Sequence, residues 1–152
     1  MTSPVSIPAG HALVGADFDA YENLTGPWTS YVATWTASSS NPAIGNGTID
    51  GHYIQAGDLL IYKGVIVVGS TTTFGTGYWI ITIPVAVTLG QRNVGVAALH
   101  DSSTSTNDRA GALELLSSTT FRVVANGRVD ATTPFTWASG DVLQWFYVGE
   151  CA

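Results

Sequence analysis

The sequence has little cysteine and little charge. Cys151 is the one cysteine among 152 residues, and charged residues make up 11% of the chain against 45% hydrophobic ones. A chain this apolar and this weakly charged does not have the composition of a disordered protein. A domain of about 150 residues buries roughly 68–70% of its unfolded surface, so it needs neither disulfides nor a structural metal. We therefore expect one compact domain.

Basic residues are scarcer than acidic ones. The chain has five Lys and Arg against eleven Asp and Glu, which gives a net charge of −6. The basic residues are scattered along the chain: Lys63, Arg92, Arg109, Arg122 and Arg128. Nucleic-acid affinity comes largely from clustered Lys and Arg. We expect no nucleic acid and no anionic membrane among the partners.

Long apolar runs are also missing. The longest ones, residues 59–68 and 78–89, are interrupted by Lys63 and Gly64 or by Pro84. Neither reaches the ~20 residues that span a bilayer. The N-terminal residues lack the basic start and uninterrupted apolar stretch of a secretory signal. We expect a soluble product made in the cytosol, without a membrane segment.

The first 28 residues differ from the rest and form a predicted N-terminal arm. Val14, Phe18 and Tyr21 recur at helical spacing, which predicts a short amphipathic helix within residues 15–24. A helix this short is not stable alone. It needs a surface to dock on, which its own domain or a neighbouring subunit would supply.

From residue 29 to 152 the pattern is that of strands, with β-branched and aromatic residues in short runs between turn residues. No helix-length segment follows the arm, which favours an antiparallel, all-β domain. About eight strands in this length predict a jelly-roll-like β-sandwich. The expected strands are residues 30–37, 47–55, 58–69, 78–83, 93–99, 110–116, 121–125 and 142–148.

Two of these strands, within residues 59–68 and 78–83, are too continuously apolar for a sheet with one wet face. Either both of their faces are covered within the chain, or their outer faces pack against other subunits. A bend is expected at Lys63-Gly64, because glycine inside a strand often marks a bulge or corner.

The residue types that carry catalysis or bind metals show no supporting pattern. His11, His52 and His100 lack the i, i+2 or i, i+4 spacing that lets two ligands of one element grip a zinc ion. No Gly-x-Ser-x-Gly elbow lifts a nucleophilic serine above a sheet. We expect no catalytic residue, no cofactor and no metal ligand, and hence no enzyme.

Asp101 and Asp108 bracket the polar loop 102–107, where they are explained as loop residues. A calcium site built from oxygen ligands stays open there, although the spacing matches no EF-hand. Most of the five tryptophans lie in strands and are expected in the core or an interface. Trp28 and Trp137 lie beside turns and prolines, and are the better candidates for contact with a partner. Trp137, Asp101 and Asp108 are thus the candidate exposed ligand contacts.

Several phrases of the sequence resemble a domain that recurs in virion proteins of tailed bacteriophages of actinobacteria. They fall between residues 31 and 148. The phrases are YVATWTASSSNPAIGNGT (31–48), GHYIQAGD (51–58), GSTTTFGTGYW (69–79), IPV (83–85) and PFTWASGD (134–141). Members of that family are minor tail proteins or head decoration proteins. The resemblance therefore implies a structural β-domain with no catalytic residues to carry over.

We expect the 152 residues that begin at Met1 to be a complete product, which favours a capsid decoration protein over a domain of a long tail fibre. The resemblance then implies a homotrimer on the outer surface of the capsid, where it binds the major capsid protein and stabilises the shell. The arm would contact the capsid or a sister subunit through its apolar residues. These are Val5, Ile7, Leu13, Phe18, Tyr21 and Trp28.

Two alternative functions remain open. The first is a minor tail or fibre protein whose loops 71–77 and 102–108 bind host-surface glycans. The second is a glycan-degrading enzyme, which the missing pair of catalytic carboxylates disfavours.

Overall fold

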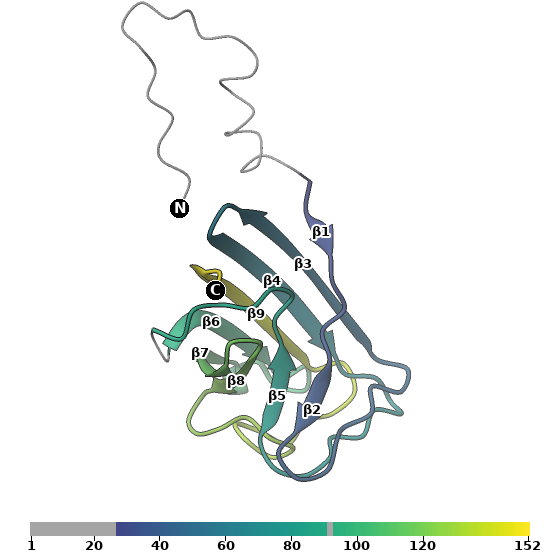
Figure 1. Cartoon of the computed structure of the whole chain (residues 1–152). Helices are drawn as coiled ribbons and strands as arrows, with labels where there is room; N and C mark the ends of the chain where they lie inside the picture. The colour runs from purple at the N-terminus through teal and green to yellow at the C-terminus, as the bar shows by residue number, and fades with distance from the viewer. Residues whose placement is uncertain (1–26, 91–92) are drawn as a thin grey trace, which may run out of the picture.

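The computed structural model describes residues 27–90 and 93–152 (Figure 1). These residues form an all-β domain whose one helical element is a short 3-10 turn, Ser105–Asn107. The strands are β1 (Thr29–Ser30), β2 (Trp35–Ala37), β3 (Thr48–Ala56), β4 (Leu59–Val67), β5 (Trp79–Thr82), β6 (Asn93–His100), β7 (Arg109–Ser117), β8 (Thr120–Val124) and β9 (Val142–Glu150). The all-β prediction is confirmed, whereas the helix expected within residues 15–24 lies outside the described residues.

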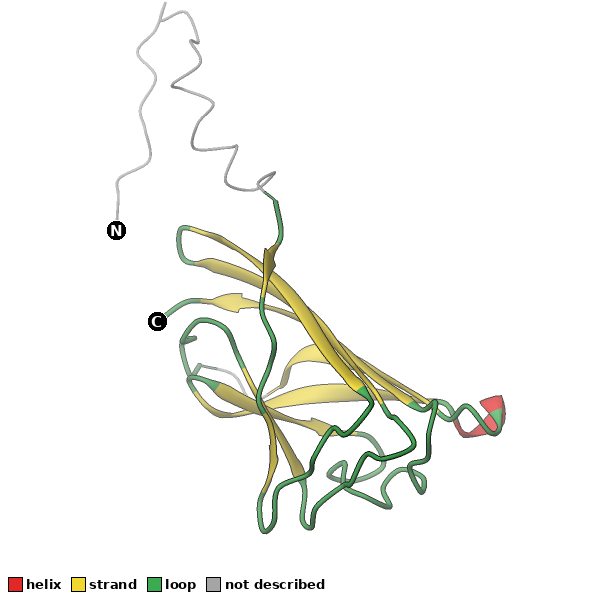
Figure 2. Ribbon diagram, turned by 90° about the vertical axis from the view of Figure 1, so that its right-hand side faces the viewer, coloured by secondary structure: helices red, strands yellow, loops and turns green. Residues whose placement is uncertain are grey.

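All nine strands belong to one antiparallel sheet in the order β1-β3-β4-β9-β6-β7-β8-β5-β2. The two edge strands, β1 and β2, are consecutive in the chain. Between them, the Tyr31 N–H donates to the carbonyl of Gly51 in β3, and the carbonyl of Thr34 accepts from the N–H of Thr82 in β5. One short segment therefore contacts both edges, and the sheet curls into a half-barrel (Figure 2).

This arrangement corrects the predicted first strand and refines the fold class. The expected strand 30–37 is divided into β1 and β2, because its two ends pair with opposite edges of the sheet. A jelly-roll sandwich of separate sheets is not confirmed, since the nine strands are joined in a single hydrogen-bonded order.

The core lies inside the curl and is rich in aromatic rings. Trp79 is at its centre, with its ring centroid 4.8 Å from that of Trp35 and 4.9 Å from that of Trp137. Along β9, Leu143, Trp145 and Tyr147 are buried while the residues between them are exposed. The alternation is what a strand with one covered face requires.

No bulge interrupts β4 at Lys63-Gly64, where a bulge or corner was expected. β4 keeps an unbroken register with both β3 and β9 from Leu59 to Val67. Gly64 is needed for another reason: a Cβ built there would overlap the indole of Trp145 at Cζ2 and come within 2.5 Å of Cε2. Its missing side chain makes room for the largest ring of β9.

Two turns beside the strands have backbone angles that few residues adopt. Asn126 and Gly127 have φ of 55° and 136°, and Gly140 has φ of 95°. These are left-handed conformations that Asn and Gly adopt most readily. They close the chain after β8 and before β9.

Candidate functional site

The candidate site is the convex side of the sheet, formed by strands β3, β4, β9 and β6. Alternate residues of these strands point away from the core, and we call this surface the outer face. Across it, His52, Lys63, Phe146 and Val96 form one row of directly paired residues. The flanking rows are Ile54, Ile61 and Val148 on one side, and Asp50, Val65, Gln144 and Ala98 on the other.

Large apolar side chains are exposed on the outer face. Val96 is 62% exposed, Phe146 and Val148 are 44% exposed, and Leu59 is 36% exposed. Phe146 pairs directly with Val96, and Val148 follows it on the same face of β9. Single exposed apolar residues are ordinary, but a contiguous group marks a contact surface.

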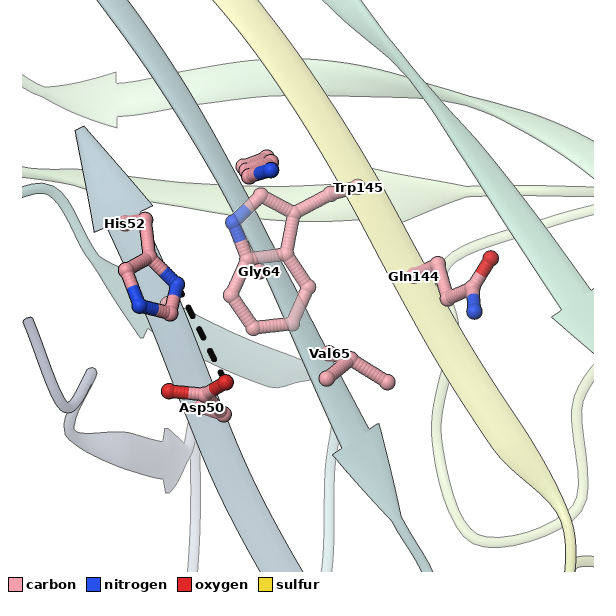
Figure 3. Close-up of a pocket in the computed structure, with 8 residues that line it drawn as sticks. Asp50, His52, Gly64, Val65, Gln144 and Trp145 are labelled. Carbon is pink, nitrogen blue, oxygen red and sulfur yellow. Dashed lines mark ion pairs between the residues drawn. The ribbon is translucent and has the colours of Figure 1, made fainter. Parts of the chain in front are cut away.

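Next to Phe146 the outer face is hollowed by about 420 Å³ (Figure 3). Asp50 and His52 of β3 line one side of this hollow and Gln144 of β9 the other, with Lys63 and Val65 of β4 between them. Gly51, Gly64 and Trp145 complete the lining. A second hollow of about 230 Å³ lies across β9, over Val96 to Ala98. The two hollows share Gln144 and Trp145.

Polar contacts at the hollow involve both signs of charge. The imidazole Nδ1 of His52 lies 3.8 Å from a carboxylate oxygen of Asp50. The ammonium of Lys63 lies 4.3 Å from the centre of the Trp28 ring, a cation–π contact. Trp28 is 38% exposed, and its contact with Lys63 places it beside the outer face.

The residues around the hollow offer a carboxylate, an imidazole, an ammonium and an amide, which are groups that bind other molecules. None of the eight lining residues carries a hydroxyl or a thiol, so the Asp50–His52 pair has no Ser, Thr, Tyr or Cys nucleophile among them. Across residues 27–90 and 93–152, no group of three or more His, Cys, Asp and Glu side chains is placed to hold a metal ion.

The predicted loop acids are brought together at the base of loop 102–107, where they bind the loop itself. One oxygen of Asp101 accepts from the N–H and hydroxyl of Ser103, at 2.9 and 2.6 Å, and the other from the amide of Asn107 at 2.9 Å. These hydrogen bonds lower the pKa of Asp101 to about 2. Its carboxylate is thus occupied by its own loop.

The carboxylates of Asp108 and Asp141 also accept hydrogen bonds from other residues of the chain. Asp108 Oδ1 accepts from the N–H of Asp101 at 3.0 Å and lies 2.9 Å from Nδ1 of His100, and these contacts, that of His100 first, lower the pKa of Asp108. Asp141 is buried and accepts from the N–H and hydroxyl of Ser102, both at 2.9 Å, and from the N–H of Ala138 at 2.7 Å.

The prediction that Trp137 is an exposed ligand contact is wrong. Trp137 is 3% exposed, and its ring packs between those of Trp79 and Phe135, at 4.9 and 4.7 Å. Asp101, which was predicted together with Trp137 as an exposed ligand contact, is also buried. A tryptophan near a turn and a proline lies in the core here because its ring packs against Trp79 of β5.

Of the predicted interface residues, Trp28 lies beside the outer face, as described above. The other five lie outside the described residues: Val5, Ile7, Leu13, Phe18 and Tyr21. Phe146, Val148 and Val96 were not predicted from the sequence as contact residues. A usable signal was the unbroken apolar run 145–148, which in a strand forces large side chains onto both faces.

Comparison with protein-family models, with curated proteins and with solved structures found no match to this chain. Within the described part of the chain, no helix has the length and apolar character needed to cross a membrane.

Proposed function

We propose that this chain is a non-enzymatic structural protein of a tailed bacteriophage particle, a head decoration protein that binds the outer shell as an oligomer and stabilises it. The major capsid protein is its proposed partner. The proposal is supported by the resemblance of residues 31–148 to virion domains and by one structural observation, the apolar outer face.

The outer face supports the proposal because its exposed apolar side chains suit contact with another protein. Val96, Phe146 and Val148 project from neighbouring strands of a rigid sheet, and their exposed area is removed from water only when another surface covers it. Aromatic side chains such as that of Phe146 are enriched at the buried centre of protein contacts.

The division into an arm and a β-domain fits this role. The buried hydrophobic core of the described residues begins at Ala33 and is drawn from strands and loops of the curled sheet. The arm has apolar residues of its own, among them Val5, Phe18 and Tyr21. We propose that they hold the capsid, while the curled sheet serves as the projecting, sandwich-like domain.

A shell-binding experiment tests the proposal. Shells assembled without this chain are mixed with the purified full chain or with a chain lacking residues 1–26, and sedimented. We expect the full chain to sediment with shells to a fixed stoichiometry and the truncated chain to stay in solution. Occupied shells are expected to resist heat and osmotic shock better than bare ones. Equal resistance would count against the stabilising role.

The alternative, a minor tail or fibre protein that binds host glycans, is favoured by the hollow of the outer face. Asp50, His52 and Gln144 supply hydrogen-bonding groups there, in an open site of about 420 Å³. Binding of cell-wall glycans that is lost on His52→Ala, together with absence from the shell, would favour this alternative.

A further inference from the structure

The outer face has a projecting ring and a hollow side by side. Phe146 is 44% exposed and stands in β9 directly opposite Lys63, which lines the hollow. A cavity of about 150 Å³ holds a benzene ring, and the hollow measures about 420 Å³. It therefore has room for the phenyl ring of another molecule.

The charges at this hollow balance each other. Asp50 and Lys63 both line it, whereas the whole chain carries a net charge of −6. Two copies of an acidic chain repel one another in general, and a surface where one carboxylate accompanies one ammonium is where they can approach. The same balance gives neither a polyanion nor a strongly basic peptide an advantage.

A ring, a hollow and both signs of charge on a single surface make that surface complementary to itself. Contacts between identical chains related by a two-fold axis use the same patch on both partners. Face-to-face packing of two sheets also covers the apolar residues of β4, which the sequence marks as too apolar for a wet face.

We propose that the outer face binds the outer face of a second copy of this chain, with Phe146 of each copy seated in the hollow of the other. The inference rests on the assignment of this face to a protein contact in the proposed function, and it names the partner. It gives a dimeric contact at this face in place of the trimer that the resemblance implies.

The first test is the molar mass of the full chain across a concentration series, by sedimentation velocity. We expect a mass of two chains that dissociates on dilution. Phe146→Asp should weaken association at least about 100-fold, because each dimer loses two central contacts. Leu89→Asp is the matched control, since Leu89 is 61% exposed, close to Val96 at 62%, and lies beyond the end of β5. It should leave the dissociation constant unchanged.

A second test uses the unaltered chain and so does not depend on a variant that folds. Hydroxyl-radical labelling with mass spectrometry measures the oxidation of Phe146 and Leu89 at low and high protein concentration. We expect protection of Phe146 on association and no protection of Leu89. A monomer at every concentration, or an oligomer that resists Phe146→Asp and leaves Phe146 open to oxidation, would overturn the inference.

Neither test contains shells, so the two proposals fail separately. A chain that dimerises through Phe146 but does not bind shells keeps the inference and loses the decoration role. A monomer that occupies shells does the reverse.

Discussion

The substitution Gly64→Ala tests whether the close approach of Trp145 to β4 holds the sheet in its observed form. The added Cβ would overlap Cζ2 of the indole and lie 2.5 Å from Cε2. Carbon atoms in contact are separated by about 3.5–4.0 Å, so the ring must move by about 1 Å. Its neighbours prevent this, because Tyr62 and Phe121 pack on it at 5.9 and 5.8 Å between ring centres.

The expected cost follows from that confinement. Overpacking a well-packed core typically costs about 1–3 kcal/mol, and a ring that is 3% exposed belongs near the upper end. With a urea m-value of about 2 kcal/mol/M, a loss of about 3 kcal/mol lowers the unfolding midpoint by about 1.5 M. Gly90→Ala is the matched control, since among the described residues, its chain neighbours apart, no atom lies within 4 Å of a Cβ at Gly90. It should leave the midpoint nearly unchanged.

The assay is urea unfolding followed by tryptophan fluorescence and circular dichroism. A double-mutant cycle with Trp145→Phe, which removes the atoms that clash, should show that the two substitutions compensate by at least about 1 kcal/mol. If Gly64→Ala is no more destabilising than Gly90→Ala, or if the cycle is additive, the packing argument is refuted.

Three further predictions concern polar groups. Asp141→Ala removes a buried carboxylate that accepts hydrogen bonds from Ser102 and Ala138, and should cost about 2–3 kcal/mol in urea unfolding because hydrogen bonds to a charged group contribute about 1.5–3 kcal/mol. The pKa of Asp101 is lowered to about 2 from 3.8, so the stability it contributes is full above pH 3.8 and is lost as the pH falls towards 2; Asp101→Asn should flatten the stability profile in that window. Burial, and secondarily Asp58, raises the pKa of the Cys151 thiol, so its alkylation at pH 8 should be slower in the folded chain than in urea, as mass spectrometry would show.

Much of the fold follows from periodicity. Seven of the eight strands expected from the sequence appear with ends shifted by a few residues, because β-branched and aromatic runs between turn residues identify strands well. The first expected strand, residues 30–37, was not predicted correctly. Its division into β1 and β2 depends on which edges of the sheet come together. Pairing between residues far apart in the chain cannot be read from local sequence.

The candidate site was harder to predict from the sequence than the fold. The apolar run 59–68 predicted an unusual outer surface, but the hollow beside Phe146 depends on how β3, β4 and β9 lie together. Trp137 shows an error in the other direction. Its neighbours in the sequence suggested an exposed loop, yet its ring is buried in the core. Burial of a loop residue is decided by tertiary packing, which short-range patterns do not contain.

The glycine at position 64 shows how a local signal can be detected for the wrong reason. A glycine inside a strand predicted a bulge or corner, and the structure has an unbroken ladder there with a tryptophan across it. Both explanations satisfy the rule that glycine in a strand marks a bulge or a close approach. The ring of Trp145, one strand away, decides between them.

The central claim is that this chain decorates the shell of a phage particle, and cryo-electron microscopy of the particle tests it most directly. Shells assembled without the chain are imaged before and after its addition. The account predicts added density at every equivalent position of the outer shell, and loss of that density when residues 1–26 are deleted. A bare shell, or density confined to the tail, would contradict it.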